Sequence, residues 1–366
     1  MAFKNIRDYI FNKLIFPKVL IVDKPGIIIN KSISKFGKEK ARTRVVYHFE
    51  DIAVNLYLES IKKLGREKTD DLWYKIGKDG ATRYLFSLRK KIIQEKLSKL
   101  ILDQVFNTIC GTGMTFAERF NYNLKEKSFT SEGRNCIICN KTKSSAFMAG
   151  IVSGILSSIL KKNIEAESRC IDCPNKCKII ANLDIPKKYI PDMSDLIPDE
   201  NYDSLNFPKN LNGSQDNKSF TDLLRFKVIR LNPQNNVFYF KDQVIVPSEI
   251  DVSNFSFKNY FKSGEEELFK STVIKTSESI AKKILKDENN IKEKINFLKN
   301  MISAFGWGIA HFKGIDRKII VYFEYPPVSR YGSLFHTYVI NGYLNSVYNK
   351  KLKIEESTPS RIIFSY

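Results

Sequence analysis

Five of the six cysteines in this chain lie between positions 136 and 177. Cys136 and Cys139 form a Cys-x2-Cys pair, and Cys170, Cys173 and Cys177 follow as a second group. Each short loop points two thiolates at one centre, and zinc takes four such ligands in a tetrahedron. A site closed by four thiolates leaves no open coordination position, so the spacing predicts one structural zinc rather than a catalytic metal.

The cluster holds one sulfur more than a tetrahedral site needs. Cys173 and Cys177 compete for the fourth position, and Glu167 could enter as an oxygen ligand. An iron-sulfur cluster is the chemical alternative because it also takes four thiolates, although the spacing lacks the closer cysteines of ferredoxins. Disulfides are not expected in a reducing cytoplasm, where we expect this protein to reside.

The two cysteine groups flank an apolar segment, 147–160, which predicts a helix. A shift of 188 positions gives this segment a counterpart in the second half of the chain, with Gly154, Leu156, Ser158 and Glu167 matched by the same residue types. At this shift Cys170 falls on Thr358. The chain is therefore predicted to be an internal duplication in which only the first copy binds metal.

Each half also shows the same order of predicted elements: a hairpin, helices, strands, a helix and a strand. The hairpins are 18–29, with a Pro-Gly turn, and 227–240. This order indicates an α+β fold in which an antiparallel sheet carries helices on one face. We predict domains at 1–190 and 223–366, joined by a linker at 191–222 that is rich in Pro and Asn, and the two halves could pack as a pseudo-dimer.

The residues from Cys139 to Cys177 resemble the 4-vinyl reductase domain, whose fold is shared with subunits of transport protein particles (TRAPP). The resemblance rests on the Ala149–Gly154 helix, the segment 160–167 that leads into Cys170, and the Gly306-Trp-Gly308 turn of a degenerate second copy. It implies two tandem domains of this family and a cavity for a hydrophobic small molecule. In related sensor domains zinc is held by Cys, Glu and two further Cys, which implies Cys136 or Cys139 with Glu167, Cys170 and Cys177.

The charge of +20 is concentrated in the first half. Residues 1–190 hold 36 Lys and Arg against 19 Asp and Glu, whereas residues 191–366 hold 24 against 21. A basic half indicates an acidic partner, which we expect to be RNA, DNA or a ribonucleoprotein. Two sets of basic residues are predicted to contact phosphate: Lys35, Lys38, Lys40, Arg42 and Arg44 in a loop, and Arg83, Arg89, Lys90, Lys91, Lys96 and Lys99 on a helix.

The sequence holds no set of catalytic residues that we recognise. It has no glycine-rich phosphate loop and no Ser/His/Asp arrangement. Its three histidines are predicted to be structural or surface residues, with His48 opening a helix, His311 on a strand and His336 in an amphipathic helix. No apolar run is long enough to span a bilayer. We therefore predict a non-enzymatic zinc protein that binds nucleic acid, with a sensor for a hydrophobic molecule and a metal-dependent redox enzyme as alternatives.

Overall fold

The structure is a computed structural model of the whole chain. It describes residues 20–30, 43–84, 102, 105–106, 116–123, 125–126, 128–134, 138–172, 176–192, 217–232, 237–315, 317–326 and 334–366. Helices and antiparallel sheets are both present, so the predicted α+β class is confirmed. Within these ranges no helix is both long and apolar enough to cross a membrane.

The first half runs from a three-stranded unit through two helices to a second sheet. Its elements are β1 (Leu20–Lys24), β2 (Ile27–Asn30), β3 (Thr43–Phe49), α3 (Glu50–Leu64), α4 (Arg66–Tyr84), β4 (Phe116–Asn123), β5 (Ser128–Arg134), α6 (Cys139–Thr142), α7 (Ala146–Leu160), β6 (Glu165–Asp172) and β7 (Lys176–Asn182).

The second half follows the same plan after a short helix. Its elements are α9 (Phe220–Arg225), β8 (Ile229–Asn232), β9 (Val237–Phe240), β10 (Gln243–Glu249), α10 (Ile250–Lys262), α11 (Glu266–Ile284), α12 (Ile291–Ala304), β11 (Ile309–Ile315), β12 (Lys318–Glu324), α13 (Leu334–Tyr348), β13 (Lys353–Ser357) and β14 (Arg361–Ser365).

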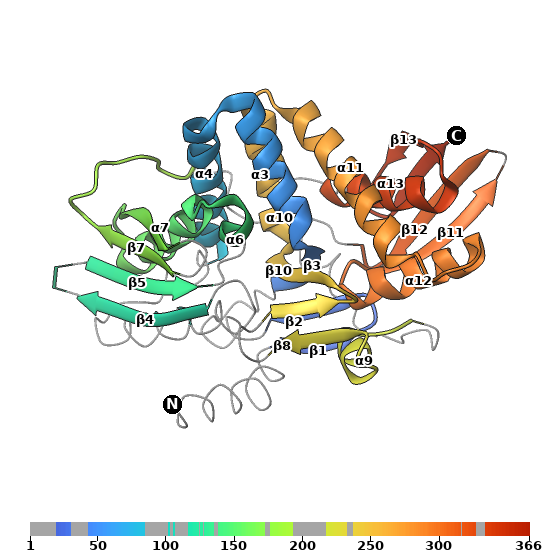
Figure 1. The fold of residues 1–366 in the computed structure, drawn as a ribbon, viewed down its shortest axis with the longest axis horizontal. Helices are drawn as coiled ribbons and strands as arrows, with labels where there is room; N and C mark the ends of the chain where they lie inside the picture. Colours follow the sequence, from blue (N-terminus) through green and yellow to red (C-terminus); the bar gives the residue numbers. More distant parts are fainter. Residues whose placement is uncertain are drawn as a thin grey trace.

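Each half ends in a four-stranded antiparallel sheet, and the two sheets have equivalent strand orders. They are β4-β5-β7-β6 and β11-β12-β14-β13, and they lie at opposite ends of the molecule in Figure 1. The third sheet is shared: β1-β2-β3 of the first half continues into β10-β9-β8 of the second. One sheet therefore joins the two halves through the β3–β10 pair.

The central elements repeat at a spacing of 200 residues. Strands β3 and β10 begin at 43 and 243, helices α3 and α10 at 50 and 250, and helices α4 and α11 at 66 and 266. In the antiparallel β3–β10 ladder Tyr47 pairs with Pro247, its own counterpart. Ser60 likewise contacts Tyr260, with 2.6 Å between the two hydroxyl oxygens. Counterparts that touch each other mark a pseudo-twofold axis through these two pairs.

The helices around this axis are exchanged between the halves. Helix α3 packs against α11, and α10 packs against α4, as the four central helices of Figure 1 show. Polar contacts follow the same exchange, since Trp73 donates to the Tyr260 hydroxyl at 3.1 Å and Asn259 donates to Asp79 at 3.3 Å. The halves are thus packed like the subunits of an intertwined dimer.

Helices α7 and α13 are held to their sheets by the same pair of hydrogen bonds, 188 positions apart. Ser153 donates to the Ile164 carbonyl at 2.6 Å, and Asn341 donates to the Leu352 carbonyl at 3.0 Å. Four residues later along each helix, Ser157 and Asn345 accept from the amides of the same two residues. These bonds fix the 188-residue register in three dimensions.

Glycine permits the close crossing of α7 on α4 and of α13 on α11. A Cβ at Gly150 would lie 2.1 Å from the Tyr74 carbonyl oxygen, and one at Gly342 would lie 2.4 Å from the Ile274 carbonyl oxygen. Since real Cβ atoms do not approach backbone so closely, only glycine fits at both crossings.

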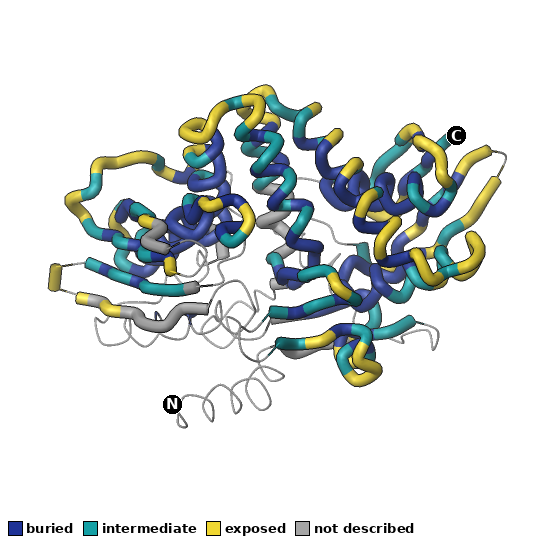
Figure 2. Tube along the Cα trace, in the orientation of Figure 1, coloured by how far each residue is buried: buried dark blue, intermediate teal, exposed yellow. Residues whose placement is uncertain are grey.

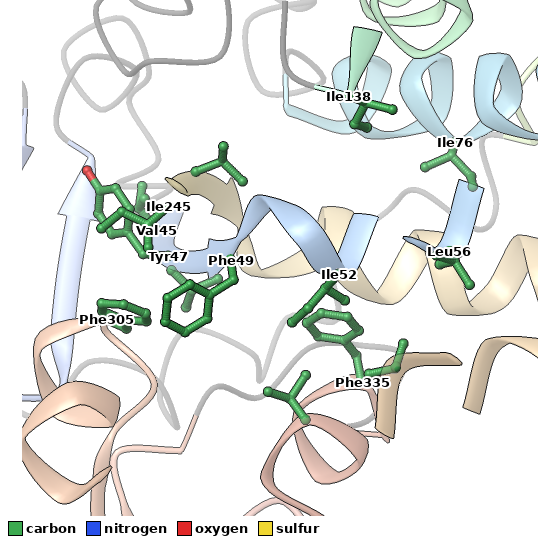
Figure 3. Close-up of a cluster of buried hydrophobic side chains, with 14 of the residues drawn as sticks. Val45, Tyr47, Phe49, Ile52, Leu56, Ile76, Ile138, Ile245, Phe305 and Phe335 are labelled. Atoms are coloured by element: carbon green, nitrogen blue, oxygen red, sulfur yellow. The ribbon is translucent and has the colours of Figure 1, made fainter. Parts of the chain in front are cut away.

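One hydrophobic core runs through both halves and the shared sheet. Figure 2 shows buried segments continuing from the α7 lobe through the central helices to the α13 lobe. In Figure 3, Tyr47 and Phe49 of β3 lie beside Phe305, which follows α12. The Trp307 indole also donates to the Tyr47 carbonyl at 2.8 Å. The predicted domain boundaries remain a prediction, but within the described residues the halves do not have separate cores.

Three details differ from the sequence analysis. His48, predicted to open a helix, lies in strand β3, because β3 continues to Phe49 before α3 begins. Helix α10 was not predicted, although it is the counterpart of α3. The predicted linker ends in ordered structure: Ser219 caps α9 by accepting from the Asp222 amide, and Asp222 accepts from the Ser219 amide in return.

Candidate functional site

A cavity of about 90 Å³ lies where the pseudo-twofold axis passes between the central helices, and we call it the axial cavity. Three pairs of its lining residues are counterparts in the two halves. Its lining consists of His48, Phe49, Ile52, Ala53, Leu56, Trp73, Ile138, Phe147, Val246, Pro247, Ser248, Ser256, Phe269 and Phe335. The paired positions are His48 with Ser248, Leu56 with Ser256, and Phe147 with Phe335.

The walls of the axial cavity are mainly apolar and come from both halves. Figure 3 shows Ile52 of α3 beside Phe335 of α13, with Phe49, the last residue of β3, just before α3. Trp73 packs edge-on against Phe147, with ring centroids 5.7 Å apart. Because neither half encloses the cavity alone, this space exists only through the packing of one half on the other.

The polar residues in the lining of the axial cavity are His48, Ser248 and Ser256, and a second histidine lies behind His48. The His48 ring lies 5.1 Å from that of Trp307 and 5.7 Å from that of His336. Burial lowers the pKa of His48 to about 3. Burial also lowers the pKa of His336, and the nearby His48 and Arg44 act in the same direction. Both imidazoles are therefore neutral at pH 7, and each can offer one donor and one acceptor nitrogen.

His336 differs from most buried polar residues. Its side chain is 2% exposed, and neither ring nitrogen has a hydrogen-bond partner in the part of the chain that the structure describes. Leaving a buried polar group unpaired costs about 1 to 3 kcal/mol. The histidine pair has no counterpart across the axis, because Ser248 and Met148 occupy the equivalent positions.

Two of the predicted metal ligands come together in the structure. The sulfur atoms of Cys139 and Cys177 lie 3.2 Å apart, and both side chains are buried beneath α7. Cys170 is the direct ladder partner of Cys177, so its backbone lies beside the same point. Cys136 and Cys173 lie outside the described residues. Within the described ranges no group of three or more His, Cys, Asp or Glu side chains is placed to hold a metal ion.

Glu167 lies on a different face of the sheet from this pair. It is the ladder partner of Ile180, whereas Cys170 is the partner of Cys177, and neighbouring positions along a strand alternate between faces. Its carboxylate lies 4.0 Å from the Lys188 ammonium group. For the predicted metal site, this register favours a ligand set made only of cysteine thiolates over one that includes Glu167.

The backbone beside Cys139 is strained. Ile138 has φ of 69° and ψ of −48°, a conformation that is rare for a β-branched residue. The strained turn is held by its neighbours: the Ile138 amide donates to Glu50 at 3.3 Å, and its carbonyl accepts from the Thr142 amide at 2.9 Å. Strain of this kind persists where surrounding structure fixes a functional loop, which fits a metal-binding Cys-x2-Cys turn.

Arg44 is a correction to the predicted phosphate-binding set. Its side chain is 2% exposed, and its guanidinium donates to backbone carbonyls of both halves, among them Gly26 and Pro326, each at 2.7 Å. A buried guanidinium that donates its hydrogen bonds to carbonyl groups inside the protein cannot reach a phosphate. Arg83 lies in α4 with an undescribed side chain. The remaining predicted positions lie outside the described residues: Lys35, Lys38, Lys40, Arg42, Arg89, Lys90, Lys91, Lys96 and Lys99.

A buried ionic cluster around Lys78 was not predicted from the sequence. The Lys78 ammonium group donates to Glu165 at 2.8 Å and to the Tyr189 carbonyl at 2.6 Å, and the Tyr74 hydroxyl also donates to Glu165. Burial lowers the pKa of Lys78, while Lys78 and Tyr74 hold that of Glu165 below its usual range despite its burial. Every charge in the cluster is paired, so it serves to fasten the segment after β7 against α4.

Sequence reasoning did not find the axial cavity. Its polar lining comes from β3, β10 and α10, and none of these three elements was predicted as such. The one usable signal was the set of aromatic residues at equivalent positions, Phe147 and Phe335.

No protein-family model matches the chain, and no curated protein matches it. Among solved structures, the chain is similar to the crystal structure of the phenol-responsive sensory domain of the transcription activator PoxR with phenol. The sequence identity is 15%, the TM-score is 0.29, and the match covers 41% of this chain and 85% of that one. At this TM-score the likeness carries no conclusion about fold or function, and the resemblance to the 4-vinyl reductase domain stays a prediction.

Proposed function

We propose that this protein is a binding protein rather than an enzyme, and that the axial cavity holds a small, mainly apolar molecule. The observation that carries the proposal is an apolar cavity on the pseudo-twofold axis with His48, Ser248 and Ser256 in its lining. A serine hydroxyl can take part in three hydrogen bonds and an imidazole in two, so these walls can pair with one polar group of a ligand.

The size of the cavity limits the ligand. Pockets for drug-sized molecules measure about 300 to 1,000 Å³, and a cavity of about 150 Å³ takes benzene. At about 90 Å³ the axial cavity fits a molecule of about four heavy atoms, such as a branched three-carbon alcohol. Because the walls come from both halves, the ligand would stabilise their packing and so report its presence through the central helices.

Thermal unfolding of the full chain with propan-2-ol and with its apolar isostere 2-methylpropane tests the proposal. A ligand at 100 times its Kd stabilises the folded state by about 2.7 kcal/mol, and propan-2-ol should act at lower concentration because its hydroxyl can pair with the polar wall. Ala53→Leu fills the cavity and should abolish the shift. Ala146→Leu, at a half-exposed alanine outside the cavity, is the matched control.

Two outcomes would contradict the proposal. One is the absence of a shift with either compound. The other is an equal shift in wild type and Ala53→Leu, since the ligand would then bind elsewhere.

We also propose that the cysteine cluster holds one structural zinc. The support is the 3.2 Å approach of the Cys139 and Cys177 sulfur atoms, the adjacent backbone of Cys170 and the strained turn at Ile138. Thiolates bind zinc and would supply the crosslink between α6 and the β6–β7 hairpin. Metal analysis of the purified protein should find one zinc per chain, and iron with a visible absorption band would contradict this.

A further inference from the structure

An open hollow of about 720 Å³ lies on the second half, away from both sites described above, and we call it the lysine groove. It is formed by the start of β8, the β9–β10 turn and the C-terminal end of α11. Five of its ten lining residues are Lys or Arg, against 60 of 366 in the whole chain. The cations are Lys227, Arg230, Lys241, Lys283 and Lys286.

Two of these cations form the frame of the groove. Arg230 donates to Asp242 at 3.0 Å, joining β8 to the β9–β10 turn. Lys241 donates to the Ile284 carbonyl at 2.7 Å and to Asp287 at 3.1 Å, which joins the turn to the end of α11. These contacts account for both carboxylates in the lining and leave its other three cations unneutralised.

The remaining cations are Lys227, Lys283 and Lys286, all exposed. Among the described residues none of the three has an ion pair or a side-chain hydrogen bond to another residue. Like charges gathered around one hollow repel each other. An anion bound in the groove would relieve this repulsion.

An exposed aromatic residue is the chain neighbour of one of these lysines. Phe226 immediately precedes Lys227 and is 61% exposed, although it follows a helix whose other aromatic residue, Phe220, is buried. The Lys218 ammonium group lies 5.8 Å from the centre of the Phe226 ring. An aromatic face beside cations is the arrangement that binds unpaired bases by stacking while the cations follow the phosphates.

We propose that the lysine groove binds single-stranded nucleic acid, with Lys227, Lys283 and Lys286 on the phosphates and Phe226 stacked on a base. This site is independent of the axial cavity and of the basic residues predicted in the first half. An acidic protein surface fits less well, because protein interfaces depend on buried apolar anchors and the groove lining offers only Val228 and Ile284.

Fluorescence anisotropy with a labelled 15-nucleotide oligo(U) tests the proposal on the full chain. The triple variant Lys227→Glu, Lys283→Glu, Lys286→Glu should weaken binding at least tenfold and reduce the slope of log K against log salt by about 2, at about 0.7 per phosphate contact. Phe226→Ala should weaken oligo(U) binding about tenfold and leave heparin binding unchanged.

A matched control separates local contacts from net charge. Lys125→Glu, Lys161→Glu, Lys162→Glu makes the same change in charge at exposed positions of the first half and should bind within twofold of wild type. Equal loss in both triple variants would overturn the proposal, as would unchanged binding in the groove variant. Uridine monophosphate that competes as well as the 15-mer, or a Phe226→Ala variant that binds normally, would overturn the assignment to a strand of nucleic acid.

Discussion

The two halves of this molecule share a plan and differ at the hairpin that closes each terminal sheet. In the first half the strands of this hairpin are longer, since β6 and β7 have eight and seven residues against five each in β13 and β14, and Cys170 pairs with Cys177 near its end. In the second half the counterpart of Cys170 is Thr358, whose hydroxyl accepts from the Arg361 amide at 3.1 Å and whose amide donates to the Arg361 carbonyl at 2.8 Å. The same terminal hairpin therefore carries thiols in one half and a hydrogen-bonded turn in the other.

This difference predicts unequal dependence on metal. Cys177→Ser should remove zinc from the protein and with it metal-linked stability on the order of 10 kcal/mol, the scale of structural zinc sites. Hydrogen exchange should then show β6 and β7 losing protection while β13 and β14 keep it, because the second hairpin is closed by Thr358. Cys110→Ser, at the sixth cysteine of the chain and outside the cluster, is the matched control. Equal zinc content and equal protection in both variants would show that the cluster is not a metal site.

A smaller effect is expected at the helix crossings. Gly150→Ala should destabilise the fold by at least about 3 kcal/mol in urea unfolding, because the new Cβ would meet the Tyr74 carbonyl at 2.1 Å. Gly342→Ala should be similar, with its contact at 2.4 Å. Gly314→Ala, which meets nothing within 4 Å, is the control. A loss below 1 kcal/mol at Gly150 would mean that the helices move apart freely.

Much of this plan was predictable from sequence, and the reasons are local. The α7 and α13 segments are long apolar runs with glycine at matching positions, so the 188-residue register was visible before the structure. The hairpins β1–β2 and β8–β9 carry turn residues between short apolar strands. The Cys139–Cys177 approach also follows from spacing, because each cysteine belongs to a compact group.

The centre of the molecule was not predictable in the same way. Its repeat is 200 residues, not 188, and few residue types match between α3 and α10. Strands β3 and β10 pair with each other across the halves. The strands are about 200 residues apart, so no local sequence pattern predicts this pairing. Arg44 shows the consequence: its charge indicated an exposed phosphate contact, while its burial between both halves depends entirely on that pairing.

The histidine pair predicts an asymmetric response to acid. Both folded pKa values are lowered, so the unfolded chain binds protons below pH 6.5 that the folded protein does not. Stability is complete above pH 6.5 and falls toward pH 3, by about 1.4 kcal/mol per pH unit for each histidine. His336→Met, which reproduces the residue at the equivalent position of the first half, should remove about half of this slope in urea unfolding between pH 6 and 4.

The smallest expected difference between the halves is in the stability contributed by the side-chain hydrogen bonds that hold α7 and α13 to their sheets. Asn341→Ala should cost about 2 kcal/mol, because it leaves the buried Leu352 carbonyl without its side-chain donor. Ser153→Ala should cost only about 1 kcal/mol, because Ser157 also donates to the Ile164 carbonyl at 3.1 Å and remains after the substitution. The double variant Ser153→Ala, Ser157→Ala should then cost more than the sum of the single variants, since each hydroxyl compensates for loss of the other. Urea unfolding of the four variants measures this order, and a larger loss for Ser153→Ala than for Asn341→Ala would contradict it.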